Sequence, residues 1–352
     1  MGGPGIKAIG CYLPKAVRLN SYFYDKPEQG GLGLETSEAW IIQRTGIQSR
    51  HVAADNEFAS DMGVNASKEV LEMARMSAGD LKQIILATAT PDYQLPPTSN
   101  VVQVKLGAGN IPACDLGNAC NGALASLEMA YGLIASGFRE NALVIGTERL
   151  TRIVDYRDRA TCILFGDGAG AALVVPMENP GPFSFVIGSD GTGGEHIYLP
   201  GVGAAGVYPA SEENMAAGRF HVKLDGQSVY KAAVKRMTET AHAALEKAGV
   251  RKEDVTWLIP HQANERIIEA VAKHLGLTEK GVSYIKNIGN ISSASIFVAM
   301  CRMYEEGWLQ QDDILLLAAI GSGYNYGSGV IQWNVPNPNP RPAGQFADYK
   351  LA

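Results

Sequence analysis

The stretch Ala113-Cys-Asp-Leu-Gly-Asn-Ala-Cys-Asn-Gly-Ala-Leu-Ala-Ser-Leu-Glu-Met-Ala130 changes from a strand-like apolar run into a helical pattern at Cys120. A thiol at the start of a helix lies beside unpaired backbone N–H groups, which favour its thiolate and lower its pKa. The stretch therefore predicts a nucleophile, and a buried structural cysteine is the alternative. Apolar residues recur after the thiol at spacings of three and four, which predicts the buried face of a core helix: Leu124, Leu127, Ala130 and Tyr131.

The composition is typical of a soluble globular enzyme. The chain has 352 residues, of which 46% are hydrophobic and 19% charged, and this length fits two domains or one duplicated unit. The net charge of −6 argues against general nucleic-acid binding. No apolar run approaches the roughly 20 residues that span a bilayer, and no signal peptide is evident. We therefore expect a cytoplasmic protein that binds neither nucleic acid nor membrane.

The cysteines point to a reduced protein. The chain has five, at positions 11, 114, 120, 162 and 301, and none forms a Cys-x-x-Cys pair. Most lie within apolar stretches. We therefore expect no disulfide, no structural zinc and no metal cofactor.

Strand-like runs alternate with helical patterns along the whole chain. The predicted strands are Gln83–Thr90, Ala142–Ile145, Ala169–Val175, Trp257–Ile259 and Ile314–Ala319. The predicted helices are Ser60–Ala78, Cys120–Ser136, Gly226–Ala248, Glu265–Leu275 and Ile296–Glu306. Strands that alternate with helices of this length indicate α/β sheets that are mostly parallel and covered on both faces.

The layout looks duplicated, with a boundary near Pro176. It gives an N-terminal half, residues 1–175, that carries the thiol, and a C-terminal half, residues 176–335. A Pro-rich tail, residues 336–352, is expected to be extended and poorly packed. Between Gly188 and Arg219 the glycine-rich sequence has no clean period, which predicts a long loop or lid with a functional role.

A nucleophilic thiol needs a base or a charged partner, and the chain has six histidines. His261 directly follows the apolar strand Trp257-Leu-Ile-Pro260 and precedes a predicted helix. It therefore stands at the carboxyl end of a strand, where open α/β sheets bind their ligands. A lone histidine there is often structural. Its pairing with Cys120 at the equivalent junction of the other half favours a functional role.

Asn290 lies where small polar residues open another helix, in Lys286-Asn-Ile-Gly-Asn-Ile-Ser-Ser-Ala-Ser-Ile296. A side-chain amide can donate a hydrogen bond to a developing oxyanion without titrating, and an N-cap residue is the structural alternative. Cysteine, histidine and asparagine together leave two chemistries open. One is a papain-like hydrolase, whose Cys-Gly-Ser/Ala-Cys-Trp/Tyr signature is missing here. The other is acyl transfer to carbon.

Six stretches in order carry a more specific signal: Thr36–Arg50, Ala119–Gly122, Asp158–Ala171, His261–Ile268, Gly289–Ser295 and Gly321–Ser328. On these stretches the chain, from Ile6 to about Trp333, resembles a β-ketoacyl-acyl-carrier-protein synthase III. This is the FabH-like family of the thiolase superfamily. The resemblance implies a thiolase-like duplicated αβαβα layered fold, with two mixed, mostly parallel sheets around central helices.

The resemblance implies a role for each candidate residue. Cys120 would be acylated by an acyl-coenzyme A, and malonyl-acyl-carrier protein would then lose CO₂ in a decarboxylative Claisen condensation. His261 and Asn290 would stabilise the enolate, and the backbone N–H groups of Cys120 and Gly323 would hold the oxyanion. The product would be a β-ketoacyl-acyl-carrier protein in fatty acid or polyketide-type biosynthesis.

The resemblance also implies a coenzyme A site. Trp40 would stack on adenine, and Arg44, Arg159 and Arg266 would lie near the phosphates and the tunnel entrance. A planar guanidinium group suits phosphate because it donates hydrogen bonds in pairs. Since the coenzyme A thioester is a substrate, no cofactor is expected.

Four further positions are expected to shape the acyl pocket. Asn121 replaces a usual Ser or Ala, Ala123 stands where Phe is common, and Phe297 replaces a usual Pro. Leu95 aligns with the family residue that reaches across the dimer to close the pocket, so a homodimer is expected. Acetyl is the usual donor of the family, and a longer or functionalised acyl chain remains open.

Other functions also remain open at this point. A relative of these synthases could pass the acyl group to an oxygen or nitrogen nucleophile without decarboxylation. A hydroxymethylglutaryl-type synthase would need a carboxylic acid in the half that contains the cysteine, and no clear match is visible there. A non-condensing cysteine hydrolase and a non-catalytic partner subunit are the remaining alternatives.

Overall fold

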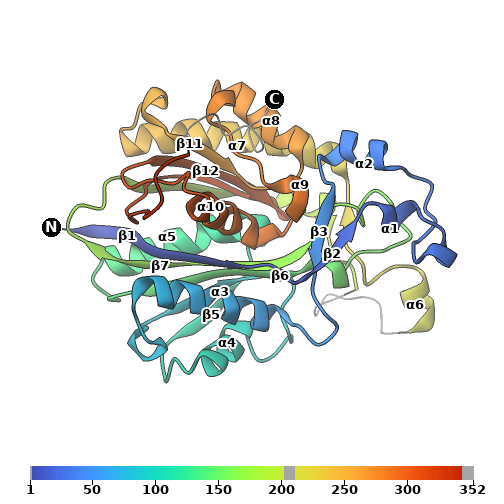
Figure 1. Cartoon of the computed structure of the whole chain (residues 1–352), viewed down its shortest axis with the longest axis horizontal. Helices are drawn as coiled ribbons and strands as arrows, with labels where there is room; N and C mark the ends of the chain where they lie inside the picture. The colour runs from blue at the N-terminus through green and yellow to red at the C-terminus, as the bar shows by residue number, and fades with distance from the viewer. Residues whose placement is uncertain (1, 202–210, 343–352) are drawn as a thin grey trace.

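Two β-sheets enclose a central layer of helices, and further helices cover both outer faces (Figure 1). The computed structural model describes residues 2–201 and 211–342. From one side of the molecule to the other, the layers are helix, sheet, helix, sheet and helix. This order confirms the expected α/β, αβαβα layered fold.

The first sheet is built from residues before 178 and has five strands. Their order is β1 (Gly3–Tyr12), β7 (Asp167–Met177), β6 (Ala142–Arg149), β4 (Ile84–Ala87) and β5 (Ala113–Leu116). Its outer face is covered by helices α3 (Ala59–Ala74) and α4 (Thr98–Leu106). Strands β4 and β6 are buried along their whole length, and β4 and the first half of β6 are accordingly continuous apolar runs.

The second sheet is built from residues after 182 and has four strands. Their order is β11 (Trp257–Pro260), β12 (Ile314–Gly321), β13 (Asn325–Gln332) and β8 (Phe183–Ser189). Helices α7 (Gly226–Ala248) and α8 (Glu265–Leu275) pack on the outer side of this sheet. The strands of the two sheets therefore come from different parts of the chain. The division into residues 1–175 and 176–335 stays a prediction.

Both sheets are mixed, as expected, but the expectation that parallel pairs prevail is wrong. Parallel pairing joins β4 to β5, β4 to β6 and β11 to β12. The pairs β1–β7, β6–β7, β12–β13 and β8–β13 are antiparallel. Strands β12 and β13 are joined by a tight turn, so no crossover helix separates them. The sequence pattern of alternating strands and helices missed these connections.

The central helices are α5 (Gly122–Ala135) and α10 (Ser295–Glu305). Helix α10 is buried on nearly every side from Ser295 to Met303, because it lies between the two sheets. Glycines in the strands allow the central helices to lie close to the sheets. A Cβ atom on Gly170 of β7 would lie 2.5 Å from Cβ of Phe297, so α10 can rest directly on the strand.

The remaining elements surround this core. The short helices are α1 (Ser21–Tyr24), α2 (Glu38–Thr45), α6 (Glu212–Ala216) and α9 (Ile285–Ile288). Two two-stranded sheets pair β2 (Ala16–Leu19) with β3 (Ser49–Val52), and β9 (Ile197–Tyr198) with β10 (Lys223–Leu224). The predicted loop Gly188–Arg219 is thus partly ordered, because it contains β9 and α6. Residues 202–210 within it lie outside the described residues.

Two smaller expectations need correction. Leu124, Leu127 and Ala130 of α5 are fully buried, but Tyr131 is exposed and stacks on Phe183 at the sheet edge. The start of the predicted tail is mostly exposed, as expected, but it is not loose, because Asn337 donates to the carbonyls of Tyr304 and Leu309. Arg341 pairs with Asp313 at 2.6 Å in the same region. Residues 343–352 of the tail lie outside the described part.

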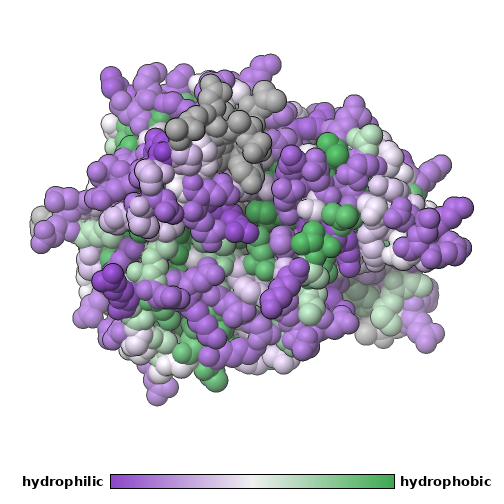
Figure 2. Space-filling view, in the orientation of Figure 1, coloured by the Kyte–Doolittle hydropathy of each residue, from purple (hydrophilic) through white to green (hydrophobic). Residues whose placement is uncertain are grey.

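The face seen in Figure 2 is mostly hydrophilic, with apolar residues in small groups between the polar ones. The large apolar side chains lie mainly in the interior, where they fill the spaces between the layers. Among residues 2–201 and 211–342, no helix is both long and apolar enough to cross a membrane.

Candidate functional site

Cys120 lies where strand β5 leads into the central helix α5. A 3₁₀ turn, Ala119–Asn121, holds it directly before the α-helix begins at Gly122. The end of β12 packs against this turn, since a Cβ atom on Gly321 would lie 2.5 Å from the backbone nitrogen of Cys120. The junction from strand to helix is thus confirmed. The second half of the chain touches the thiol's backbone.

The expectation of a lowered pKa at Cys120 is wrong for the free protein. Burial raises the pKa of the Cys120 thiol to about 12, and the charge of Glu148 adds to the increase. A hydrogen bond with the Ser292 hydroxyl opposes the increase without cancelling it. Loss of water around the sulfur therefore outweighs the partial charge of the helix start. The thiol is therefore neutral in the free protein, and a reaction at its sulfur would need a base.

His261 follows the last residue of β11, as predicted. Its backbone N–H donates to the carbonyl of Ala318 in the neighbouring strand at 2.7 Å, which fixes its position. The side chain is only 1% exposed. Neither ring nitrogen has a hydrogen-bond partner among the described residues. Burial lowers the pKa of His261 to about 3, so the imidazole is neutral and both nitrogens can serve a ligand.

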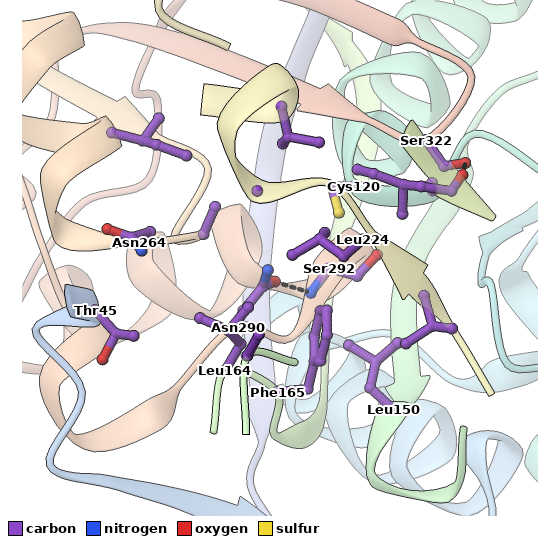
Figure 3. A pocket seen from close by; sticks show the side chains of 18 of the residues that line it. Thr45, Cys120, Leu150, Leu164, Phe165, Leu224, Asn264, Asn290, Ser292 and Ser322 are labelled. Atoms are coloured by element: carbon purple, nitrogen blue, oxygen red, sulfur yellow. Dashed lines mark hydrogen bonds between the residues drawn. The ribbon is translucent and has the colours of Figure 1, made fainter. Parts of the chain in front are cut away.

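Asn290 is held by a segment of the other half. Its backbone N–H donates to the carbonyl of Leu164 at 2.9 Å, and its carbonyl accepts from Gly166 at 3.0 Å. The side-chain oxygen accepts from the backbone N–H of Ser292 at 2.8 Å. That bond fixes the amide orientation and turns its NH₂ group toward the side of Cys120 (Figure 3). The segment Asp158–Ala171 thus contributes to the site by placing Asn290.

One cavity of about 500 Å³ brings these three residues together. Cys120, His261 and Asn290 line it, and the sulfur of Cys120 points into it near Leu224 and Ser292 (Figure 3). Most of the remaining wall is apolar and includes Ile197, Leu199 and Val222 from the long segment between the sheets. The described part of the predicted loop therefore forms one wall of the cavity.

The predicted coenzyme A residues gather at one part of this cavity. Trp40, Arg44 and Arg266 line it. Arg159 does not line it, but its guanidinium carbon lies 4.9 Å from the ring centre of Trp40, and that of Arg44 lies 5.6 Å away. All three arginines are exposed. An aromatic ring flanked by cations suits a flat, negatively charged ligand group.

The second predicted oxyanion donor, Gly323, lies in the turn between β12 and β13. Its φ of +133° is in a region that residues with a side chain rarely adopt. The preceding residue, Ser322, lines the cavity. Gly323 is therefore close to the site in the chain, and its conformation explains why a glycine stands there.

The predicted acyl-pocket residues do not line the cavity of the single chain. Asn121, Ala123 and Phe297 are buried beneath it, with exposed fractions of 1% or less. The Asn121 amide donates to the side-chain oxygen of Asn118 at 2.8 Å. Leu95 lies on a surface loop and is 81% exposed. None of these four residues touches the open space in front of the thiol.

Sequence reasoning missed a buried carboxyl group close to the thiol. Glu148 of β6 accepts from the backbone N–H of Ala89 at 3.0 Å, from Thr90 Oγ1 at 2.7 Å and from Ser293 Oγ at 2.8 Å. Burial raises its pKa, and a hydrogen bond with Ser292 opposes this. Ser292 therefore lowers the pKa of both Cys120 and Glu148. The sequence signal was weak, since Glu148 ends an ordinary apolar strand.

Two family models match the chain. One is described as 3-oxoacyl-[acyl-carrier-protein (ACP)] synthase III and matches residues 114–191, and the other describes the C-terminal part of the same enzyme and matches residues 245–333. A β-ketoacyl-[acyl-carrier-protein] synthase III from Caldanaerobacter subterraneus subsp. tengcongensis is 41% identical, over 94% of this chain and 98% of the relative. The synthase III of Neisseria gonorrhoeae is 40% identical, over 93% and 98%.

Solved structures of similar proteins have the same fold. The 3-oxoacyl-[acyl-carrier-protein] synthase III of Aquifex aeolicus VF5 is 36% identical with a TM-score of 0.84, and covers 94% of this chain and 100% of its own. The priming β-ketosynthase of the R1128 polyketide biosynthetic pathway is 32% identical with a TM-score of 0.86, and covers 96% and 98%. The layered arrangement is therefore that of known condensing enzymes.

Proposed function

The chain belongs to the β-ketoacyl-[acyl-carrier-protein] synthase III family, and from this premise we propose that it is an acyltransferase that forms carbon–carbon bonds. It loads an acyl group from acyl-coenzyme A onto Cys120 and joins it to malonyl-acyl-carrier protein. The product is a β-ketoacyl-acyl-carrier protein for fatty acid or polyketide-type biosynthesis. The observation that carries this proposal is a buried, neutral imidazole without a hydrogen-bond partner among the described residues, in one cavity with a thiol and a side-chain amide.

The loading step needs a base, because the pKa of Cys120 lies far above neutral. The neutral His261 accepts the thiol proton as the sulfur attacks the thioester carbonyl. The oxyanion that forms is held by the backbone N–H groups of Cys120 and Gly323. Coenzyme A thiolate leaves and takes up a proton, and the acyl group remains on the sulfur.

The second step develops negative charge on another thioester oxygen. Loss of CO₂ from the malonyl group leaves an enolate, and fixed donors lower the free energy of that state. Asn290 supplies such a donor, because its oxygen is occupied by Ser292 N–H and its NH₂ group faces the cavity. A neutral His261 with its proton on the ring nitrogen nearest the oxygen supplies the other. The enolate carbon then attacks the acyl-cysteine.

The outer part of the cavity accounts for substrate binding. Trp40 stacks on the adenine ring, and Arg44, Arg159 and Arg266 neutralise the phosphates. These exposed arginines also suit an acidic carrier protein that must bring its malonyl group to the same opening. No metal or other cofactor takes part in these steps.

We further propose a cytoplasmic homodimer in which the partner completes the acyl pocket. Leu95, Tyr93 and Val104 are apolar and 81%, 58% and 80% exposed, and they lie near β5, the last strand of the first sheet. Such exposure costs free energy unless another surface covers it. With Leu95 supplied by the partner, the buried Asn121, Ala123 and Phe297 set the depth available to the acyl chain.

Incubation with a panel of acyl-coenzyme A thioesters, followed by intact-mass measurement, tests the loading step and identifies the acyl donor. One acyl mass per chain is expected, with none in Cys120→Ala. Release of CO₂ from malonyl-acyl-carrier protein tests condensation. Loading without this release, together with acyl transfer to an alcohol or amine, would establish the alternative acyltransferase. Acylation retained in Cys120→Ala would overturn the assignment of the nucleophile.

A further inference from the structure

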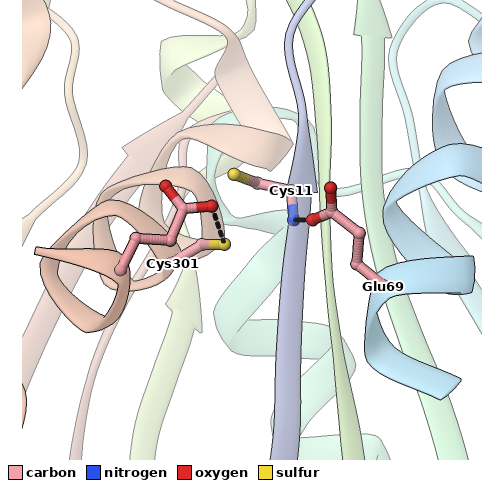
Figure 4. A group of neighbouring side chains, drawn as sticks. Cys11, Glu69 and Cys301 are labelled. Atoms are coloured by element: carbon pink, nitrogen blue, oxygen red, sulfur yellow. Dashed lines mark hydrogen bonds between the residues drawn. The ribbon is translucent and has the colours of Figure 1, made fainter. Parts of the chain in front are cut away.

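A second group of thiols lies apart from the cavity, at the free edge of the first sheet. Cys11 comes from β1, Glu69 from α3, and Cys301 and Glu305 from the last two turns of α10 (Figure 4). One potential ligand atom from each side chain lies within 4.8 Å of all the others. Two sulfurs and two carboxylate oxygens from three separate elements therefore converge on one point. We call these four residues the sheet-edge cluster.

The burial of the cluster resembles that of a shallow binding site. Cys11 is 6% and Cys301 3% exposed, so the sulfurs form a buried floor. Glu69 and Glu305 are exposed and form the rim. An ion could thus enter from solvent and come to rest on the sulfurs.

Neighbouring groups already orient both carboxylates. The backbone N–H of Cys11 donates to Oε2 of Glu69 at 2.9 Å, and Arg302 Nη1 donates to Oε2 of Glu305 at 2.7 Å. Glu305 turns its other oxygen, Oε1, to the sulfur of Cys301, 3.7 Å away. Metal ligands in proteins are generally held by such outer hydrogen bonds. These hydrogen bonds leave the other oxygen of each carboxylate available to a metal ion.

Without a cation the cluster gathers groups that repel one another when ionised. The hydrogen bond with Cys11, burial, and the nearby charges of Glu305 and Glu69 all raise the pKa of Cys301. Burial and the charges of Glu305 and Glu72 raise the pKa of Glu69, and Arg302 opposes this only in part. The cluster also sits at the carboxyl end of α10, where the helix dipole favours positive charge.

We propose that Cys11, Glu69, Cys301 and Glu305 bind a Zn²⁺ ion that ties β1, α3 and α10 together. Zinc accepts both thiolate and carboxylate ligands in a tetrahedral site, with Zn–S bonds of about 2.3 Å and Zn–O bonds of about 2.1 Å. Such a site separates its ligand atoms by about 3.3 to 3.8 Å. Small side-chain rotations would shorten the separations between the ligand atoms, now up to 4.8 Å, to those of a zinc site. Calcium and magnesium prefer oxygen ligands and would not use the two sulfurs.

Binding exchanges protons for the metal. Each of the two thiols forms a Zn–S bond and releases its proton to water, and each carboxylate forms a Zn–O bond. No electron is transferred. Arg302 remains bonded to Glu305 and offsets part of the negative charge that the ligands leave.

This site departs from the expectation of no structural zinc. That expectation was based on the absence of closely spaced cysteine pairs. Cys11 and Cys301 are 290 positions apart in the sequence and meet only because α10 packs across β1. The proposed ion is structural and lies outside the cavity, so it takes no chemical part in acyl transfer.

Zinc binding to the full-length protein tests the proposal. The protein is treated with a chelator, kept reduced, and titrated with ZnCl₂ against a chromophoric chelator. All variants carry Cys120→Ala, which removes the catalytic thiol as a competing ligand. We expect one Zn²⁺ per chain, and at least about a tenfold weaker affinity when Cys301→Ser is added. Cys162→Ser is the matched control, because Cys162 is equally buried and should leave the affinity unchanged.

Co²⁺ provides a second readout that reports the ligands directly. A thiolate-to-cobalt charge-transfer band is expected in the parent, a weaker one in Cys301→Ser and none in the variant that lacks both Cys11 and Cys301. If a core substitution prevents folding, Glu305→Gln at the exposed rim removes one ligand without disturbing the core, and should also weaken Zn²⁺ binding. Absence of stoichiometric zinc, or equal affinity after loss of both cysteines, would overturn the proposal.

Discussion

Two thiol environments in this chain differ in what surrounds the sulfur. Cys120 lies in an apolar cavity with a neutral imidazole and an amide, and the carboxyl group of Glu148 is close to it. Cys301 lies at a sheet edge beside a second thiol and two carboxylates. Cys301 is buried and Cys120 is half-buried, and the pKa of each is raised.

The comparison shows that burial alone does not decide what a thiol does. Neutral hydrogen-bond donors and acceptors can move a proton and hold an oxyanion, so Cys120 is equipped for covalent catalysis. Anionic oxygens cannot hold the oxyanion of a carbonyl substrate, but they complete a cation site. The neighbours of each sulfur therefore determine its chemistry.

The largest expected effect concerns the amide beside Cys120. Asn290→Ala should lower the rate of condensation by about 10²- to 10³-fold, because one preorganised donor to the enolate is lost. Acylation of Cys120 should persist, since that step uses other donors. CO₂ release and intact mass measure the two steps separately. Cys301→Ser serves as the control for the comparison and should leave both steps unchanged.

The next effect concerns stability and pH. The folded-state pKa of His261 is about 3 and its unfolded value about 6.5, so the unfolded chain binds the proton first. This group's contribution to stability is fully present above pH 6.5 and is lost as the pH falls toward 3. We expect the free energy of unfolding to fall by about 3 kcal/mol from this group between pH 6.5 and pH 4.

Urea unfolding of the wild type and His261→Ala across this range measures that contribution. The difference in stability between the two proteins should shrink as the pH falls. Parallel curves would show that the imidazole is not buried in its neutral form. The carboxylates of the sheet-edge cluster are present in both proteins, so their titration cancels in the difference.

A smaller effect distinguishes the thiols by their access to reagents. With a pKa of about 12, Cys120 should be alkylated by iodoacetamide about tenfold faster for each unit of pH between 7 and 10. Cys162 has a similar pKa but is only 2% exposed and does not line the cavity, so it should remain unlabelled. Mass mapping of labelled peptides follows both. A rate at Cys120 that levels off near neutral pH would mean that its thiolate is stabilised after all.

The smallest expected effect concerns the stability of the protein when the sheet-edge cluster holds no metal. Glu69→Gln removes one of two neighbouring negative charges, while the amide oxygen can still accept from the Cys11 N–H. We expect the metal-free variant to be as stable as the wild type or more stable by about 0.5 kcal/mol, since the charge is at the surface. Chemical denaturation in the presence of a chelator checks this. A clear loss of stability would show that Glu69 serves the apo fold.

Sequence patterns predicted the helices with strong end signals well. The bounds of α7 and α8 agree with the structure at both ends, because Asp225 and Asn264 cap their first turns and Gly249 and Gly276 end them. Strand β13 was missed as a strand. Its sequence, Asn-Tyr-Gly-Ser-Gly-Val-Ile-Gln, has little intrinsic strand preference, and the strand forms because β12 and β8 pair with it on both sides.

The residues of the candidate site could be proposed from local motifs. Cys120, His261 and Asn290 each stand at an element junction that the sequence marks, and the structure places them in one cavity. Glu148 and the sheet-edge cluster could not be found in this way. Their meaning depends on contacts between residues far apart in the sequence, such as Glu148 with Ser293 and Cys11 with Cys301. Similarly, the raised pKa of Cys120 depends on desolvation, which only the packed structure reveals.

Helix α10 joins these two thiol environments. It begins just after Ser292–Ala294, beside the cavity, and about 9 Å of helix separates Ser295 from Cys301. Because it is packed between two sheets, it shifts as a rigid rod rather than bending. An ion bound near Cys301 would hold the helix in place. It would thereby stabilise the positions of the hydrogen-bond donors beside the cavity. The temperature at which acyl transfer fails would then report how well the cell supplies the protein with zinc.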